Sequence, residues 1–180
     1  MFARVIAAAS LVLAMSAPTW AADTNNLQLL RDAQKKTLTY AQLTVFDSVH
    51  LNVDNGVVTL SGWVTMPYKS SDLAKRIAST PGVTQVVNQI EVLPVSQWDD
   101  TLRMRIARAI YGNSTFWRYG AMANPPIRIV VENGHVTLDG VVNNDVERMM
   151  ARSLATGFGE FSLTNALKTD AEVERELERL

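Results

Sequence analysis

The residues best suited to chemistry in this sequence are two histidines and the polar side chains near them. His50 and His135 are the chain's only histidines, and both lie in alternating segments typical of strands. His135, Thr137 and Asp139 occupy positions i, i+2 and i+4 and so share one face of their strand. An imidazole beside a carboxylate could serve a metal or acid–base site, but zinc needs at least three protein ligands and the chain has no cysteine. We therefore expect a solvated sheet face, no catalytic residues, no metal and no cofactor.

A second set of residues combines arginines with aromatic side chains. From Trp98 to Tyr111, helical periodicity places one apolar stripe toward the core and a second stripe, which includes Met104, on the opposite side. Guanidinium groups bind phosphate oxygens, and amphipathic rings settle at the depth of lipid headgroups. We therefore predict a site for an anionic phospholipid surface, formed by Arg103, Met104, Arg108, Tyr111, Phe116, Trp117, Arg118 and Tyr119.

Two other interpretations of this basic and aromatic segment remain open. The second stripe could pack against the first half of the chain or against a C-terminal helix, because aromatic loops are more often buried than exposed. Interleaved basic and aromatic residues also fit single-stranded nucleic acid, but export and a net charge of −1 argue against that partner. The exposure of Tyr111 and Trp117 in the folded chain distinguishes a lipid site from simple packing.

The elements that must hold these residues come from an internal duplication. Residues 53–64 and 131–142 match at a constant offset of 78, counted from Val53 to Val131. Each copy has an Asn-Gly corner between two apolar strands, and this pair is the strongest hairpin signal because both corner residues take positive φ. The motif residues are Asn55, Gly56, Gly62, Asn133, Gly134 and Gly140. We expect Gly62 and Gly140 to face inward, where the missing side chain lets a helix approach the sheet.

The same order of elements is predicted in both halves. The first half indicates a helix from residues 24–26 to Leu38, strands at 49–53 and 58–64, a helix capped by Ser70 or Ser71, and a strand at 83–92. The second indicates a helix at 96–111, an irregular linker at 113–126, strands at 127–131 and 136–142, a helix capped by Asn143 or Asn144, and a strand at 160–167. Thr169 and Glu172 form a capping box that opens a last helix.

These elements predict an α+β protein of two tandem αββαβ domains, each a three-stranded mixed sheet with two helices on one face. We place the first domain at residues 23–95, the second at 96–168 and a C-terminal helix at 169–180. Domains of roughly 70 residues are marginal alone, so we expect the two to pack together or to share a helix.

The N-terminus, residues 1–22, is typical of a signal peptide. Arg4 supplies a short positive region, residues 5–15 an apolar run, and residues 16–22 a small-residue segment suited to cleavage near Ala21 or Ala22. The run is shorter than the roughly 18 residues that a membrane span needs, although an uncleaved anchor is the alternative. Because no cysteine is present, the chain is not a lipoprotein. We expect export to the periplasm.

The two copies together resemble the BON domain of bacterial envelope proteins. The resemblance rests on Gly56, Val58, Leu60, Gly62, Val64, Pro81, Gly82, Val83, Val86, Asn88 and Ile90 in the first copy and on Gly134, Val136, Leu138, Gly140 and Val142 in the second. Gly159-Glu160 stands where the family has Gly-Val. The resemblance implies a periplasmic, non-enzymatic module associated with envelope and outer-membrane integrity, osmotic stress and attachment to phospholipid surfaces.

Two functions are therefore expected. The first is an envelope-maintenance or stress protein that binds anionic phospholipid surfaces through its second domain. The alternative is a protein-interaction or oligomer-forming scaffold in the periplasm without direct lipid binding, because two exposed sheet faces and a leucine-bearing terminal helix could pair subunits. Nucleic acid is not expected as a partner.

Overall fold

Two hairpins of the same geometry form the centre of the two halves of the chain. The structure, a computed structural model, describes residues 19–177, so the predicted signal peptide lies outside it except for residues 19–22. Asn55 and Gly56 have φ of 48° and 81°, and Asn133 and Gly134 have φ of 51° and 79°. Both corners therefore have two left-handed residues, as the Asn-Gly pairs predict.

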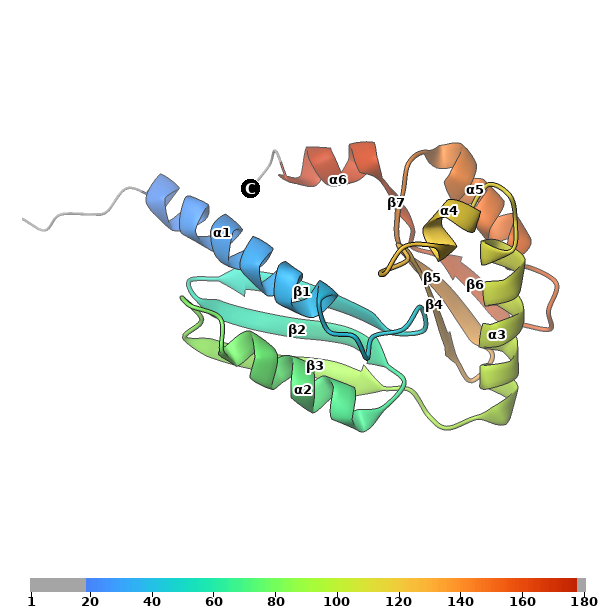
Figure 1. Cartoon of the computed structure of the whole chain (residues 1–180), viewed down its shortest axis with the longest axis horizontal. Helices are drawn as coiled ribbons and strands as arrows, with labels where there is room; N and C mark the ends of the chain where they lie inside the picture. Colours follow the sequence, from blue (N-terminus) through green and yellow to red (C-terminus); the bar gives the residue numbers. More distant parts are fainter. Residues whose placement is uncertain (1–18, 178–180) are drawn as a thin grey trace, which may run out of the picture.

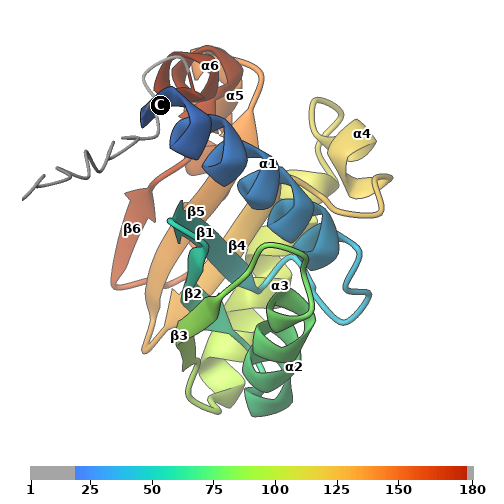
Figure 2. The same cartoon turned by 90° about the vertical axis from the view of Figure 1, so that its left-hand side faces the viewer.

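The first unit is a three-stranded sheet covered by two helices (Figure 1). Its elements are α1 (Thr19–Leu38), β1 (Ser48–Asp54), β2 (Val57–Val64), α2 (Pro67–Ala78) and β3 (Gln85–Val92). The central strand β2 is antiparallel to β1 and parallel to β3. Both helices lie on the same side of the sheet (Figure 2). Alternation along β2 buries Val58, Leu60 and Val64 against Leu73 and Ile77 of α2.

The second unit repeats this layout with additions. Its elements are α3 (Gln97–Tyr111), α4 (Trp117–Gly120), β4 (Ile127–Glu132), β5 (His135–Val142), α5 (Asp145–Leu154), β6 (Ser162–Asn165), β7 (Lys168–Thr169) and α6 (Asp170–Leu177). The central strand β5 is antiparallel to β4 and parallel to β6 and β7. The segment from Ser162 to Thr169 corresponds to β3 at an offset of 77, but it is divided into two short strands. The predicted α+β fold is thus confirmed, with a four-stranded second sheet in place of three strands.

Gly62 and Gly140 are required for a different reason from the one predicted. Their φ values are 107° and 118°, and a Cβ at either position would collide with the carbonyl oxygen of Ser48 or Pro126 on the neighbouring chain segment. No helix atom is among the nearest atoms at either glycine. The close approach is therefore between adjacent backbones of the sheet and not between sheet and helix.

Most helix ends follow the local signals in the sequence. Ser96 Oγ accepts from Asp99 N at 3.2 Å, and Asn144 Oδ1 accepts from Glu147 N at 3.0 Å. The capping box before α6 is present, because Thr169 N donates to Glu172 Oε2 at 2.9 Å and Glu172 N donates to Thr169 Oγ1 at 3.3 Å. The predicted cap at Ser70 or Ser71 is wrong. α2 begins at Pro67, where the fixed φ of proline suits the first helical position.

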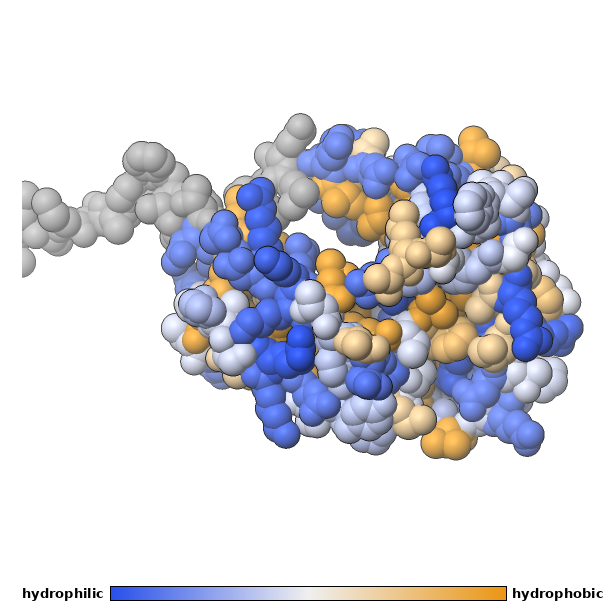
Figure 3. Space-filling view, viewed as in Figure 1, coloured by the Kyte–Doolittle hydropathy of each residue, from blue (hydrophilic) through white to orange (hydrophobic). Residues whose placement is uncertain are grey.

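The two units lie side by side (Figure 1) and touch along the connector before β1 and the start of β4, where hydrophobic residues gather at the surface (Figure 3). Ile129 N, on the edge of β4, donates to Val45 O at 2.8 Å, and Arg128 Nη1 donates to Thr44 O at 2.9 Å. Phe46 packs against the core of the second unit. Val130, which alternates away from that core, is also buried. The face of the second sheet away from its helices is therefore partly covered, contrary to the expectation of two exposed sheet faces.

In the part of the chain that the structure describes, no helix combines the length and apolar character needed to cross a membrane.

Candidate functional site

The structure divides the eight residues of the predicted lipid site into buried and exposed groups. Arg103, Phe116 and Tyr119 are buried, and Tyr111 is half-buried. The other four, Met104, Arg108, Trp117 and Arg118, are exposed, with 66% of Trp117 accessible. The buried three cannot contact a bilayer in this fold, which corrects their predicted role.

Arg103 is buried because it fastens α3 to the second hairpin. Its guanidinium donates to Val131 O and to Asp100 Oδ1, both at 2.5 Å. Four residues earlier on the same side of the helix, buried Asp99 accepts hydrogen bonds from Asn133 N at 2.9 Å and Gly134 N at 2.8 Å. These two charged side chains hold the Asn-Gly corner and the strand that leads into it. Helical spacing alone places Arg103 beside the second stripe but does not show its reach to Val131.

The linker rings turn inward because α5 presents small side chains to the core. At the offset of 78, Leu73 and Ile77 of α2 correspond to Ala151 and Ala155. Both alanines are fully buried in the same cluster as Phe116. The space that two large aliphatic side chains fill in the first unit is therefore available in the second to a ring from the linker.

Tyr119 and Arg118 are held by a buried carboxylate. Tyr119 Oη donates to Glu147 Oε2 at 2.6 Å, and Arg118 Nη2 donates to Glu147 Oε1 at 2.5 Å. The Arg118 guanidinium also lies 4.8 Å from the centroid of the Tyr119 ring. Burial, with the hydrogen bond to Glu147, raises the pKa of Tyr119. Arg118 is thus exposed but already paired with Glu147. The contacts of Arg118 and Tyr119 with Glu147 attach α4 to α5.

The remaining part of the predicted stripe lines an apolar groove of about 460 Å³ between α3 and the connector from the first unit. Tyr111 Oη donates to Ile127 O, and burial raises the pKa of Tyr111. Tyr111 and Ala107 both pack beside the second core, as Phe46 does. The packing alternative therefore holds for Tyr111 and Ala107, whereas Met104 and Arg108 remain open at the surface.

An exposed apolar stripe on α5 was missed in the sequence. Val146, Met149 and Met150 are exposed, with 71% of Met149 accessible, and their spacing of three and four residues places them on one face. The corresponding residues of α2 are Tyr68, Ser71 and Asp72. The signal was available in the duplication: once Leu73 faces the first core, Ala151 must face the second, and the methionines then point outward.

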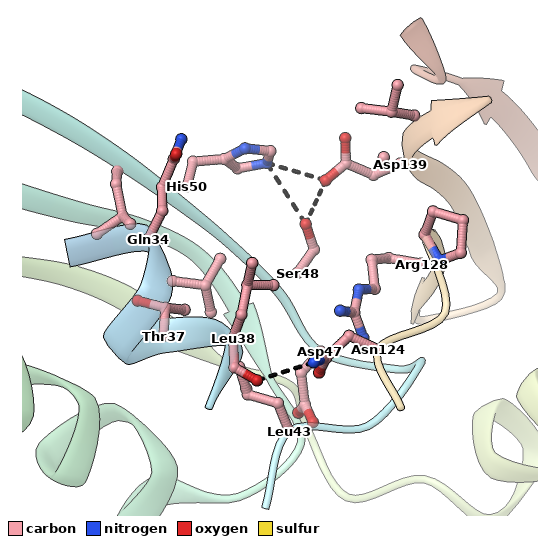
Figure 4. Close-up of a pocket in the computed structure, with 15 residues that line it drawn as sticks. Gln34, Thr37, Leu38, Leu43, Asp47, Ser48, His50, Asn124, Arg128 and Asp139 are labelled. Carbon is pink, nitrogen blue, oxygen red and sulfur yellow. Dashed lines mark hydrogen bonds and ion pairs between the residues drawn. The ribbon is translucent and has the colours of Figure 1, made fainter. Parts of the chain in front are cut away.

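A second candidate site is a cleft of about 450 Å³ between the two units, bordered by the end of α1, by β1 and by β4 and β5 (Figure 4). Asp139 accepts a hydrogen bond from Ser48 and lies 2.9 Å from His50 Nε2. The hydrogen bond between His50 and Asp139 raises the pKa of His50. Burial alone would raise the pKa of Asp139, but the hydrogen bonds from His50 and Ser48 outweigh it and lower that pKa. Asp139 is therefore an inter-unit contact, and the expected solvated face is wrong for this residue.

The Ser48, His50 and Asp139 side chains do not have the geometry of a nucleophilic triad. Ser48 Oγ and Asp139 Oδ2 both approach the same ring nitrogen, His50 Nε2, at 3.4 and 2.9 Å. A triad needs the acid on one ring nitrogen and the nucleophile on the other. His135 lies elsewhere and is exposed, with Nδ1 2.7 Å from Ser162 Oγ. Among the described residues, no group of three histidine, aspartate or glutamate side chains could hold a metal ion.

Comparisons with known proteins find one family. The model of the BON domain matches the chain twice, over residues 27–94 and 99–160. None of the curated proteins matches.

Two solved structures of CdsD, a structural protein of the type III secretion system of Chlamydia trachomatis, are similar to the chain. The C-terminal domain has 15% identity and a TM-score of 0.30, with coverage of 76% of this chain and 64% of that one. The second structure has 14% identity and a TM-score of 0.28, with coverage of 84% and 97%. These TM-scores are too low to relate the functions of the two proteins.

Proposed function

The chain belongs to the BON domain family, and from this premise we propose that it is a periplasmic, envelope-associated protein that attaches to anionic phospholipid surfaces through its second domain. BON domain proteins are typically periplasmic and generally non-enzymatic. Export by the N-terminal signal and a role in envelope maintenance under osmotic stress are parts of the same proposal. The family match supports the location, and the surface of the second domain supports the lipid partner.

The observation that carries the proposal is the apolar stripe of α5 together with Trp117. Val146, Met149 and Met150 are exposed on α5, whereas Ala151 of the same helix is buried in the core, so α5 presents apolar side chains both to the core and to solvent. Trp117 lies on α4, which the Glu147 contacts attach to α5. Exposed apolar side chains with a neighbouring indole ring suit the boundary between headgroups and acyl chains.

Exposed basic side chains lie on two helices of the second domain, α3 and α5. Arg108 on α3 and Arg152 on α5 are exposed, and among the described side chains neither is within 4 Å of a carboxylate. Their guanidinium groups are therefore available to phosphate oxygens. Arg103 and Arg118, in contrast, are already occupied by Asp100 and Glu147. Met104 beside Arg108 adds an exposed apolar contact.

The proposal is tested by sedimentation of the mature protein with vesicles of phosphatidylcholine, with and without phosphatidylglycerol. We expect binding only with the anionic lipid, and weaker binding as salt rises, because the charges are exposed and are screened. The triple variant W117S/M149S/M150S should lose binding, since these side chains are exposed and their loss leaves the core intact.

The matched control removes exposed apolar residues of the first domain. Met66 and Tyr68 are about half exposed at the start of α2, so M66S/Y68S should bind vesicles as the parent does. Equal binding of the parent and the triple variant would refute the assigned surface.

A periplasmic scaffold is the second candidate, because exposed methionines are also typical of surfaces that bind protein partners. It requires that the same triple variant lose a protein partner or change the sedimentation coefficient, while vesicles leave the parent unbound. The two sets of measurements therefore separate the candidates.

A further inference from the structure

We propose that the cleft between the two domains binds a small amphiphile with one anionic head group, and that Arg128 is the residue that holds the head group. This inference goes beyond the attachment of α4 and α5 to a bilayer, because it concerns a single molecule in a different part of the protein. The cleft has a volume of about 450 Å³, which lies within the range of small-molecule sites, about 300–1,000 Å³.

Arg128 is a partly buried cation with donors to spare. It lies on β4 on the face away from the second core and lines the cleft, where Figure 4 shows its side chain. Nη1 donates to Thr44 O at 2.9 Å. Among the described side chains, no carboxylate lies within 4 Å of its guanidinium. Burial lowers the pKa of Arg128, so the side chain bears a desolvation cost that an anion in the cleft would offset.

The two carboxylates near Arg128 already have their own partners. Asp47 pairs with Lys69 Nζ at 2.7 Å and accepts from Thr44 N and Thr65 N, each also at 2.7 Å. Asp139 is held by Ser48 and His50. Each carboxylate is thus hydrogen-bonded by a neighbouring basic residue, and Arg128 is the cation of the cleft that remains without a direct counter-ion. An anion therefore suits the cleft better than a cation does.

Most of the surface that lines the cleft is apolar, although several polar side chains border it, and this surface defines the body of the ligand. Its apolar side chains are Leu38, Leu43, Val49, Leu51, Pro126 and Val141. Leu38, at the end of α1, is 51% exposed although it lies beside these residues. A short alkyl chain in the cleft would cover Leu38 and would contact both domains. The occupant that fits is therefore a monomeric amphiphile with a carboxylate or phosphate head.

The test is isothermal titration of the full mature chain with decanoate and, separately, with decyl phosphate, each below its critical micelle concentration. We expect saturable one-to-one binding of at least one of them, which also identifies the head group. Decanol, without the charge, and acetate, without the chain, should each bind at least about tenfold more weakly. No saturable binding of either anion, or equal binding of decanol, would overturn the proposal.

Two variants locate the site. R128Q removes the charge and should weaken binding about tenfold or more, whereas R105Q, at an exposed arginine outside the cleft, should not. L38Q changes an exposed side chain and should weaken binding with an unchanged circular dichroism spectrum. If R128Q does not fold, L38Q decides, and an unchanged affinity in a folded L38Q contradicts the assignment.

Binding to the cleft is also separable from attachment to membranes. The vesicle-binding variant W117S/M149S/M150S should bind the small amphiphile with the parent's affinity, because its substitutions lie outside the cleft. Conversely, L38Q should sediment with anionic vesicles as the parent does. Loss of both activities in either variant would show that the cleft and the outer surface are one site, contrary to the proposal.

Discussion

Lys69 and Glu147 occupy the same position in the two copies and are both buried, although their charges are opposite. Each lies in the first turns of the helix that follows the hairpin, α2 or α5. Lys69 reaches Asp47 at 2.7 Å, and Glu147 reaches Tyr119 at 2.6 Å. In both domains this helix position therefore anchors the segment that precedes the first strand. The two copies therefore keep a charged anchoring side chain at this position, but the charge is positive in the first copy and negative in the second.

Replacement of Lys69 should destabilise the first domain strongly. K69M leaves Asp47 buried without its cation, and breaking a buried pair by removing one partner costs about 3–5 kcal/mol. Urea unfolding followed by circular dichroism measures the change. K75M, at an exposed lysine of the same helix, serves as the control and should change the free energy of unfolding by less than about 0.5 kcal/mol. A K69M protein as stable as K75M would show that the pair is not an anchor.

Local signals in the sequence were sufficient for the parts of the fold that form locally. The Asn-Gly corners predict both hairpins, and Ser96, Asn144 and the Thr169 capping box predict three helix starts, because each is decided by a few neighbouring residues. The start of α2 was misplaced because proline at the first position of a helix competed with two serines as the signal.

Contacts between distant segments could not be predicted in this way. The reach of Arg103 to Val131 depends on how α3 lies over β4, and the His50–Asp139 pair depends on how two domains pack. The burial of Phe116 depends on how the linker packs into the core cluster that also holds Ala151 and Ala155. Periodicity gives the face of a helix or strand, but it does not give the partner on that face.

The core role of Phe116 predicts a large effect on stability. Phe116 is fully buried, so F116A should lower the free energy of unfolding by about 3–5 kcal/mol. W117A, one residue later and exposed, is the matched control and should have little effect. Thermal or urea unfolding measures both. Similar effects of the two substitutions would contradict the division of the linker into a buried ring and a surface ring.

Gly62 in β2 and Gly140 in β5 should not tolerate a side chain. Gly62 can be tested against Gly157, a glycine outside the strands. Alanine at Gly62 must take a φ near 107° and meets the Ser48 carbonyl oxygen, whereas alanine at Gly157 must take a φ near 93° but has open space around it. A left-handed alanine costs about 1–2 kcal/mol, so G157A should show that cost alone. We expect G62A to lose at least about 1 kcal/mol more in urea unfolding. Equal losses would mean that the Ser48 backbone moves aside without cost.

Removal of the Asp99 carboxylate should destabilise the hairpin turn at Asn133 and Gly134. D99A leaves Asn133 N and Gly134 N without their acceptor, and Gly134 is buried. The expected loss is about 1–3 kcal/mol of unfolding free energy. Amide hydrogen exchange should increase at Asn133 and Gly134 more than at Asn55 and Gly56 of the first corner. Uniform exchange at both corners would show that Asp99 does not support the turn.

The contact of His50 with Asp139 predicts how the packing of the domains depends on pH. The pKa of His50 is raised above its usual 6.5, so its stabilising effect is complete below that value and is lost as pH rises through the raised pKa. The pKa of Asp139 is lowered below its usual 3.8, so its effect is present above that value and is lost as pH falls through the lowered one. The pair therefore holds between the two titrations.

The variant D139N separates this pair from the other charges near His50. Lys168, which opposes protonation of His50, is retained in the variant, so the pKa of His50 should fall to about 6.5 or below. Proton NMR of the imidazole C–H resonances measures the midpoint, with H50Q used to assign the signal. Because 55% of the His50 side chain is open to solvent, added salt should reduce the shift in the parent. The same midpoint in parent and D139N would show that the two domains are not joined through this ion pair.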